Sequence, residues 1–431
     1  MNKTQSNILN QPFVTQPTLA ETKLLLVSWS AEGVMVCYYA SWAVYRTGDG
    51  KFDVEDIDPA ICTHLIFAFA GLGPNNDTIK VLDPWNELCG GGGNCAFDRF
   101  TGLKRLKGKR KRDLVTLLAV GGWGENSEKY STMAANPAKR SSFVSSAIAL
   151  LKNHDFDGLD FDWEYPTKRG GNPEDKANYV LLLSELKNAL HANGMMLSAA
   201  VSAGKYTIDP AYDVPGMAQH LDLVNVMTYD LHGAWELQTH HHSGLYAHPN
   251  DTDGGAMLNQ DFAISYWISK GMPANKIAIG VPMYGRCWTL SGSSTGYYAP
   301  ANQPGAPGPY TNSPGFQGYN EICEAIMNEG WTVAIEPGMK EPYVYSLAHD
   351  RIWCSYEDGN SVKIKAQYAA AHGLAGMMVW GIEMDDFLGK CGRVFNLIKT
   401  MRETYAGPNI RPPSSRSRAN RKKHDQPGAR Q

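Results

Sequence analysis

The chain has 431 residues, of which 43% are hydrophobic and 10% aromatic, and its formal net charge is −3. This length and apolar content suffice for one large domain with an extensive core. A net charge so close to zero argues against a nucleic acid partner for the body of the protein. Near the amino terminus, the sustained apolar run Leu24–Val27 is too short for a signal sequence or a membrane span, so no membrane partner is expected.

Short apolar runs that predict buried strands alternate with longer runs of helical periodicity. In chain order, the predicted strands are 34–39, 62–70, 114–120, 156–166, 195–201, 223–227, 277–281 and 374–380. The predicted helices are 97–107, 137–153, 174–193, 260–270, 320–329, 362–372 and 393–405. This alternation predicts an α/β fold, the (β/α)8 TIM barrel. The competing doubly wound open sheet would need a glycine-rich phosphate turn after an early strand, and the sequence has none.

Composition divides the chain into five segments. Residues 1–30 form a polar amino-terminal extension, and residues 31–286 carry the first part of the barrel. Residues 287–356 are rich in Gly, Pro, Tyr and Ser, which predicts a small α+β insertion between strand 7 and helix 7. Residues 357–405 complete the barrel. Residues 406–431 contain seven Lys or Arg and few apolar residues, which predicts a disordered basic tail.

The stretch 156–166, FDGLDFDWEYP, contains the strongest functional signal. Side chains of a strand alternate between its two faces, so Asp160, Asp162 and Glu164 are expected to share one face. Carboxylates on the inner face of a covered sheet are costly unless they have a function. Crowded carboxylates cannot all ionise, so at least one should hold a proton at neutral pH. Glu164 is last in the row, nearest the carboxyl end where such barrels keep their active sites, and is the predicted proton donor.

The segment DGLDFDWE resembles the D-x-x-D-x-D-x-E signature of glycoside hydrolase family 18 chitinases, and the resemblance extends from about 34 to 405. It implies hydrolysis of β-1,4-linked N-acetylglucosamine polymers without a cofactor. It also implies retention, with the substrate's own acetamido group as nucleophile and an oxazolinium ion as intermediate.

The resemblance assigns a role to each acidic position. Glu164 would act as general acid and then base, and Asp162 would hold the acetamido N–H. Asp160 would share the proton network, and Asp157 would have a structural role. Tyr229, a catalytic residue in this assignment, would orient the acetamido carbonyl together with Asp230.

Aromatic side chains fall at or just past the carboxyl ends of predicted strands, where they suit the apolar faces of sugar rings. These are Tyr38, Phe69, Trp123, Tyr229, Tyr284 and Trp380. The resemblance places Trp380 under the distorted sugar. It adds the following substrate-binding positions: Trp42, Trp85, Gly121, Gly122, Tyr165, Met227, Thr228, Trp235 and Arg286.

The chain contains eight cysteines. Cys89 and Cys95 are close enough in sequence to close a local loop, and Cys287 and Cys354 bracket the insertion, which leaves their pairing open. The resemblance implies the disulfides Cys37–Cys62 and Cys323–Cys391. An even number of cysteines, together with three N-x-T glycosylation triplets, leads us to expect a secreted, extracellular protein.

Two segments depart from the usual pattern of the family. After Trp235, the loop that usually reads T-G-H-N-S-P-L carries His240, His242 and Gly244 instead. Three consecutive histidines raise the possibility of a metal, but no acidic or cysteine partner lies nearby in the sequence, so no metal site is expected. Near the last strand, residues 381–386 read GIEMDD in place of the commoner leucine–aspartate pair.

Two other functions remain as alternatives. A chitinase-like chitin-binding lectin or growth factor would keep the barrel and the aromatic cleft without turnover, but such proteins usually replace the acid at position 164. An endo-β-N-acetylglucosaminidase acting on N-glycans would use the same acidic motif. The expected partners are chitin and chitooligosaccharides, and the protein is expected to be a monomer.

Overall fold

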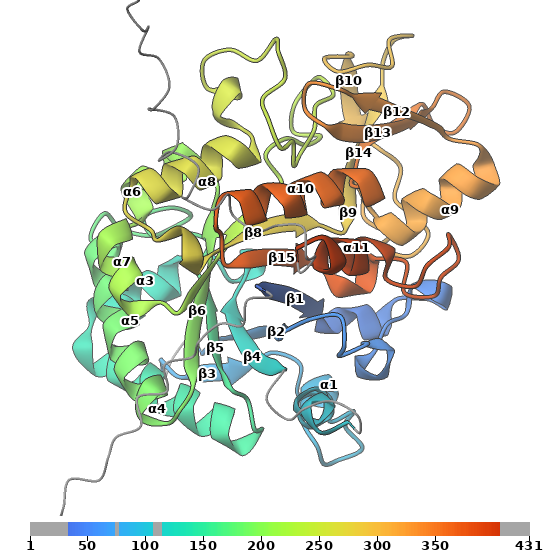
Figure 1. The fold of residues 1–431 in the computed structure, drawn as a ribbon. Coiled ribbons are helices and arrows are strands. Elements are labelled where there is room, and N and C mark those ends of the chain that lie inside the picture. The colour runs from blue at the N-terminus through green and yellow to red at the C-terminus, as the bar shows by residue number, and fades with distance from the viewer. Residues whose placement is uncertain (1–32, 74–76, 107–113, 406–431) are drawn as a thin grey trace, which may run out of the picture.

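The computed structural model describes residues 33–73, 77–106 and 114–405. The predictions for the polar extension and the basic tail therefore lie outside the described residues. Eight parallel strands form a closed barrel (Figure 1), because β1 pairs with both β2 and β15. The strands are β1 (Val34–Ala40), β2 (His64–Leu72), β4 (Val115–Gly121), β5 (Gly158–Asp162), β6 (Met196–Ser202), β7 (Leu223–Met227), β8 (Ile277–Pro282) and β15 (Gly376–Trp380). This closure confirms the predicted (β/α)8 TIM barrel.

The barrel strands are buried on both faces, which explains why they appear in the sequence as nearly continuous apolar runs. Alternate residues such as Val36, Ile66, Leu117 and Met378 fill the barrel interior. The residues between them pack outward against the helices. The inner face of β5 differs, because it carries Asp160 and Asp162 in place of apolar side chains, and Ser198 of β6 and Asn225 of β7 also point inward to Asp160.

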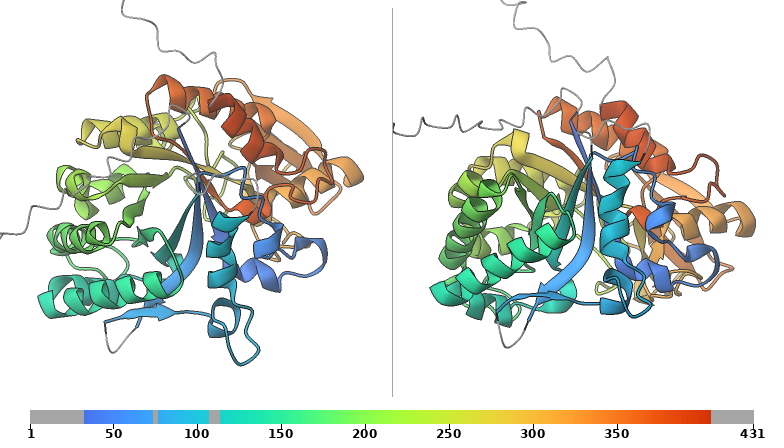
Figure 2. Two further views of the ribbon diagram at one scale, coloured as in Figure 1. Left: turned by 60° about the horizontal axis from the view of Figure 1, so that its bottom comes forward. Right: turned by 90° about the horizontal axis from the view of Figure 1, so that it is seen from below.

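Helices cover the outside of the barrel, and those coloured from teal to yellow lie along one side of it in both views of Figure 2. Helix α4 begins at the predicted Pro137, where the Asn136 side chain accepts hydrogen bonds from the amides of Ala138 and Lys139. The helices are α1 (Pro84–Glu87), α2 (Ala96–Gly102), α3 (Glu128–Ala135), α4 (Pro137–Asn153), α5 (Asp175–Ala192), α6 (Lys205–Ala211), α7 (Val214–His220), α8 (Gln260–Ser269), α10 (Gly359–Ala371) and α11 (Asn396–Tyr405).

The short elements differ most from the sequence predictions. The connection from β1 to β2 consists of 3-10 turns at 41–45, 48–50 and 54–56. The segment 80–95, which lies outside the predicted strands and helices, contains part of strand β3 (Ile79–Val81) and helix α1. Helices α3, α6 and α7 have seven or eight residues each. Such elements are too short for a clear hydrophobic period, so they were not predicted.

An α+β module interrupts the barrel between β8, its seventh strand, and α10, as predicted. It contains β9 (Tyr284–Leu290), β10 (Ala301–Pro304), β11 (Phe316–Gly318), α9 (Tyr319–Glu329), β12 (Thr332–Glu336), β13 (Glu341–Ser346) and β14 (Ile352–Ser355). Its antiparallel sheet begins at Tyr284, three residues before the predicted boundary, because β8 continues almost directly into β9.

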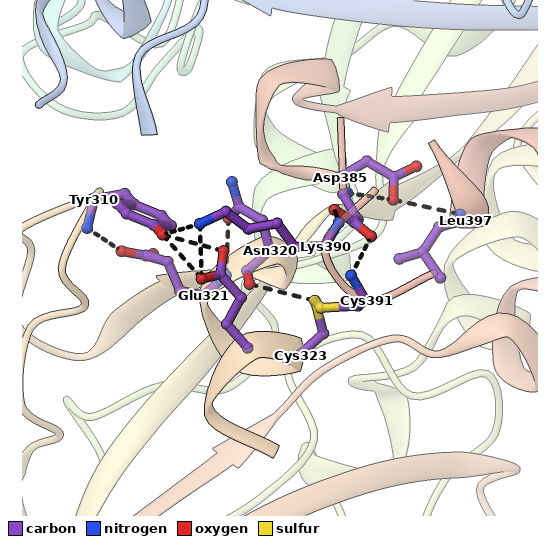
Figure 3. Close-up of a disulfide and its surroundings, with 10 residues drawn as sticks. Tyr310, Asn320, Glu321, Cys323, Asp385, Lys390, Cys391 and Leu397 are labelled. Carbon is purple, nitrogen blue, oxygen red and sulfur yellow. Dashed lines mark hydrogen bonds and ion pairs between the residues drawn. A yellow bond between two sulfur atoms is a disulfide. The ribbon is translucent and has the colours of Figure 1, made fainter. Parts of the chain in front are cut away.

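All eight cysteines lie in the described ranges and form four disulfides. The pairs are Cys37–Cys62, Cys89–Cys95, Cys287–Cys354 and Cys323–Cys391. The third pair joins the neighbouring strands β9 and β14. The fourth joins α9 of the insertion to the turn before α11 (Figure 3), so it fastens the insertion to the last segment of the barrel. In the part of the chain that the structure describes, no helix is long and apolar enough to cross a membrane.

Candidate active site

The acidic row begins on β5 and continues beyond its end. Asp160 and Asp162 lie on the strand, whereas Glu164 follows it by two residues and is partly buried. The alternation of acids and apolar residues predicts Glu164 on the strand itself, and the structure corrects that position. Between the acids, Phe161 and Trp163 point into the helical layer, where the Trp163 indole donates to Ser127 Oγ at 3.0 Å. The alternation therefore separates an inner acidic face from an outer aromatic one.

Asp160 is fully buried, and three side chains donate hydrogen bonds to its carboxylate. The hydroxyls of Tyr38 and Ser198 each donate at 2.6 Å, and the Asn225 amide donates at 3.2 Å. Burial raises the pKa of Asp160, while these three hydrogen bonds oppose the rise. Asp160 is thus held in one orientation below Asp162.

Asp162 and Glu164 lie in an environment that favours their protonated forms. Burial raises the pKa of Asp162 well above its ordinary value, and the negative charges of Glu164 and Asp160 raise it further. One Asp162 oxygen is buried without a hydrogen-bond partner among the described residues. Burial also raises the pKa of Glu164 to about 7, although Tyr165 and Arg169 lower it in part. A carboxyl group with this pKa can both give and take a proton near neutral pH.

Arg169, which the sequence analysis missed, supports the loop that carries Glu164. Its guanidinium donates to the backbone oxygens of Glu164 at 3.0 Å and Trp123 at 2.8 Å. It also lies over the Trp123 ring, 3.6 Å from the centroid. No spacing or motif in the sequence marks this contact, because the loop brings it together only after folding.

A polar wall stands at the carboxyl ends of β7 and β8. Asp230 accepts two hydrogen bonds from the Arg286 guanidinium, both at 2.7 Å, and one from the Tyr284 hydroxyl at 2.8 Å. Burial raises the pKa of Asp230, but the interactions with His242 and Arg286 outweigh this and hold it well below its ordinary value. Burial and the nearby carboxylates raise the pKa of Tyr229, so its hydroxyl stays protonated as a hydrogen-bond donor.

Aromatic rings form the opposite side of the site. Trp380, at the end of β15, is stacked with Phe69 at a centroid distance of 5.7 Å and contacts Tyr38 edge-on at 5.6 Å. Trp42 lies 6.0 Å from Trp380. Trp42, Trp123 and Trp235 are 45%, 62% and 61% exposed, so their faces are open to a ligand. Such rings suit the apolar faces of pyranoses.

These groups line one cavity of about 1000 Å³. Of the predicted residues, it is lined by Tyr38, Trp42, Phe69, Gly121, Gly122, Trp123, Asp162, Glu164, Tyr165, Met227, Tyr229, Asp230, Trp235, Tyr284, Arg286 and Trp380. Asp160 lies beneath the cavity rather than on its surface. A cavity of this size, with a few converging polar groups, is the expected form of a binding site.

Besides Asp160, three predicted positions lie away from the cavity lining. Thr228 is fully buried, and its hydroxyl donates to the Gly280 carbonyl at 2.6 Å, so it supports the polar wall from the side that faces away from the cavity. Trp85 is 54% exposed and packs against Tyr45 at 5.8 Å. Asp157 lies before β5, where its carboxylate accepts hydrogen bonds from the Thr116 amide and the Lys104 ammonium at 2.8 and 3.0 Å.

The cavity is also lined by residues that were not among the predicted site residues. Among them, Glu125 accepts hydrogen bonds from the Leu72 amide and the Tyr130 hydroxyl, and Phe316 of the insertion stacks on Tyr284 at 4.4 Å. The others are Leu82, Gly124, Ala200, Ser202, Ala203, Gly204, Thr207, Leu231 and Leu258. Ala200 and Ser202 are inward-facing residues of β6, so the alternation along this strand could have predicted them. The sequence contains no comparable signal for the residues that come from loops.

The described residues contain two groups that could hold a metal ion by proximity alone. In one, Cys323 and Cys391 already form a disulfide beside Asp386. In the other, His241, Glu341 and Glu357 surround the Lys365 ammonium, which lies 3.0 Å from Glu341 and also contacts Glu357. Burial and the charge of Glu357 raise the pKa of Glu341 well above its ordinary value, so Glu341 favours its protonated form and the single ammonium balances Glu357. The second group therefore does not need a further cation.

Comparison with known proteins places this site in a family. Residues 34–385 match the sequence profile of Glycosyl hydrolases family 18. The chain belongs to glycosyl hydrolase family 18. It is 39% identical over 365 residues to "Probable chitinase 2" of Drosophila melanogaster, with 83% of this chain and 73% of the relative covered. It is 38% identical to "Chitotriosidase-1" of Mus musculus over 401 residues, covering 91% and 82% of the two chains.

Solved family 18 structures share the fold. The Group IV chitinase of Ostrinia furnacalis in complex with allosamidin superposes with a TM-score of 0.82 at 40% identity, covering 87% of this chain and 99% of the other. Human YKL-39, described as a pseudo-chitinase with retained chitooligosaccharide binding, gives a TM-score of 0.78 at 34% identity, covering 86% and 99%. This family 18 hydrolase therefore resembles both active and inactive proteins, and its own acidic row must distinguish them.

Proposed function

We propose that the protein is a chitinase that cleaves β-1,4-linked N-acetylglucosamine polymers. The observation that carries the proposal is the carboxyl group of Glu164, which faces the cavity beyond β5 with its pKa raised to about 7 by burial. In this mechanism Glu164 protonates the glycosidic oxygen as the bond breaks, and its carboxylate then takes a proton from the incoming water.

The neighbouring groups suit a nucleophile supplied by the substrate. Asp162 faces the cavity and has an oxygen without a hydrogen-bond partner in the described part of the chain, so its carboxylate can accept the acetamido N–H and balance the positive charge of an oxazolinium ion. The Tyr229 hydroxyl can donate to the acetamido carbonyl and orient it toward the anomeric carbon. Under this mechanism the product keeps the configuration of the substrate.

Asp160 supports Asp162 from below without touching the sugar. Its three donors keep the Asp160 carboxylate in place at the bottom of the site, so that it can take the proton of Asp162 as charge develops. Asp162 then carries the negative charge that balances the oxazolinium ion. Trp380 offers a flat face for the sugar that is cleaved, and Trp42, Trp123 and Trp235 offer faces for its neighbours. A cavity of about 1000 Å³ exceeds what a single sugar fills, which fits an oligosaccharide.

The chitin-binding lectin is the main alternative. It would need the aromatic cavity but not the raised pKa of Glu164, so the acidic row favours the enzyme. The endo-β-N-acetylglucosaminidase would use the same acids on N-glycan cores. We further propose that the protein works outside the cell, as its four disulfides suggest.

Digestion of colloidal chitin, with mass-spectrometric analysis of the products, tests the proposal. We expect release of short N-acetylglucosamine oligomers, β-anomers in the first minutes by NMR, and inhibition by a thiazoline mimic of the oxazolinium ion. Chitin binding without product release would support the lectin. Cleavage of high-mannose glycoprotein but not of chitin would support the endoglycosidase.

A further inference from the structure

His242, a buried residue of the loop that departs from the family pattern, contacts the wall of the cavity from behind. Its side chain has no exposed surface. Its Nδ1 atom accepts a hydrogen bond from the Asp230 amide at 3.4 Å, and its Nε2 atom lies 3.2 Å from the Tyr284 carbonyl oxygen. An imidazole with its proton on Nε2 satisfies both contacts at once. His242 thus bridges the ends of β7 and β8, the two strands that carry the polar wall.

The backbone at Asp230 needs support of this kind. Its φ angle is +56°, in the left-handed region that costs energy for a residue with a side chain. The amide of Asp230 donates to His242, while the next amide, that of Leu231, donates to the His242 carbonyl at 2.9 Å. Both amides of the turn are therefore held by one residue.

The same residue is fixed from the side of the insertion. The His242 amide donates to Ser355 Oγ at 3.3 Å, and the imidazole packs beside the Tyr284 ring at 5.1 Å. The ring also lies 3.6 Å from the Asp230 carboxylate. Because Asp230 holds Arg286 and Tyr284 with its carboxylate, the position of its backbone sets the position of three groups that line the cavity.

We propose that His242 is a positioning residue, whose Nδ1 atom holds the left-handed turn at Asp230 and thereby the Asp230–Arg286–Tyr284 wall that contacts the sugar. This role rests on the proposed function, which makes a chitooligosaccharide the ligand of the cavity. It deepens that function by naming a residue outside the cavity on which substrate recognition depends.

Two substitutions test the two ring nitrogens of His242 separately, because an asparagine side chain can replace Nδ1 and a glutamine side chain can replace Nε2. In His242→Asn, the Oδ1 atom can take the place of Nδ1 and accept the Asp230 amide. In His242→Gln, the longer amide reaches toward the Tyr284 carbonyl and leaves the Asp230 amide without its acceptor. Loss of one such hydrogen bond corresponds to about tenfold in rate or affinity.

The experiment measures kcat and KM on a fluorogenic chitooligosaccharide and, by calorimetry, the affinity for penta-N-acetylchitopentaose. We expect kcat/KM and affinity to fall about tenfold in His242→Gln and His242→Ala, and to stay within about twofold of the wild type in His242→Asn. His240→Ala is the loop control, because His240 stacks on His232 at 3.8 Å and contacts Asp251 rather than Asp230. Thermal unfolding is recorded for each variant.

Equal losses in His242→Asn and His242→Gln would overturn the inference, as would a loss in His240→Ala as large as that in His242→Gln. Wild-type affinity in all three His242 variants would overturn it too. If the wild-type protein binds chitooligosaccharide without turnover, the proposed enzyme fails, and the affinities alone then decide the role of His242.

Discussion

At the scale of single residues, the three acids of the row differ in what surrounds them. Asp160 is saturated with hydrogen bonds from Tyr38, Ser198 and Asn225. Asp162 has two negative neighbours and an oxygen for which the described residues provide no hydrogen-bond partner. Glu164 lies at the cavity surface, beyond the end of the strand. In the proposed mechanism, one sequence motif thus supplies an anchored carboxylate, a group for the substrate and a proton donor, because each successive acid lies further from the barrel interior.

The raised pKa of Glu164 predicts a pH-dependent effect of Glu164→Gln on stability. An acid with a higher pKa in the folded than in the unfolded state binds its proton more tightly when folded. The wild type therefore loses stability as pH rises from about 4.3 to about 7, whereas the neutral glutamine does not. Urea unfolding should give equal stabilities at pH 4, and above pH 8 an advantage for Glu164→Gln on the order of 3–4 kcal/mol. A constant difference across this range would contradict the assignment.

At the scale of elements, the approach of β4 to β5 depends on Gly121 and Gly122 at the end of β4. Gly121 pairs with Asp162, its φ angle is +119°, and an added Cβ would lie 2.0 Å from the Asp162 carbonyl oxygen. The next residue, Gly122, donates to that same oxygen at 2.8 Å. The absence of a side chain at Gly121 thus lets the backbone of Asp162 reach its place in the cavity.

We predict that Gly121→Ala is strongly destabilising, by about 3 kcal/mol or more, because the clash is with backbone and the φ angle is unfavourable for alanine. Gly124→Ala is the matched control, since an added Cβ at Gly124 meets nothing within 4 Å. Chemical denaturation of the two variants makes the comparison. Similar midpoints for both would show that the turn can relax and that the close approach is not required.

The elements also show why prediction from sequence succeeds and where it stops. Strands such as β1 and β15 are buried on both faces, so their apolar runs stand out, and α4 has both a period and a start signal at Pro137. The end of β5 could not be placed, because the alternation of acids continues through Glu164 although the strand stops at Asp162. The pattern records which way side chains point, whereas the end of a strand depends on where its neighbours stop pairing.

At the scale of the whole molecule, the insertion is joined to the barrel by covalent and ionic links. The Cys323–Cys391 disulfide connects α9 to the turn before α11 (Figure 3). Lys365 on α10 is fully buried and contacts Glu341 of β13, Glu357 and the Ser243 carbonyl, the last at 2.7 Å. Phe316 is placed against Tyr284 by the insertion's own sheet, because β11 pairs with β9, and the links to the barrel fix that sheet beside the cavity.

Lys365→Met should therefore destabilise the protein strongly, because it leaves two buried carboxylates without their cation. The expected loss is about 3–5 kcal/mol, measured by chemical denaturation, and Glu341→Gln with Glu357→Gln in the same chain should recover part of it. Lys363→Met, an exposed position on the same helix, is the control and should be nearly neutral. Equal stability of the two lysine variants would contradict the assigned role of the ion cluster.

The candidate site was predictable to the extent that it is built from the barrel strands. The acids of β5 and the aromatic residues at strand ends converge because parallel strands share one carboxyl edge, a property of the fold. The resemblance to family 18 put Thr228 among the substrate-binding residues. Its side chain instead points away from the cavity and donates a hydrogen bond to the Gly280 carbonyl. Contacts made by long loops or by the insertion, such as Arg169 with Glu164 or His242 with Asp230, depend on tertiary folding and have no local signal.

The most direct test of the account is the effect of Glu164→Gln on turnover and on binding, measured on one preparation. We predict that turnover of a fluorogenic chitooligosaccharide falls by at least about a hundredfold, because the general acid is removed, while the affinity for the oligosaccharide stays within a few-fold of the wild type. Glu128→Gln, an exposed position on α3, serves as the control. A Glu164→Gln protein that keeps a tenth of the wild-type turnover would contradict the account.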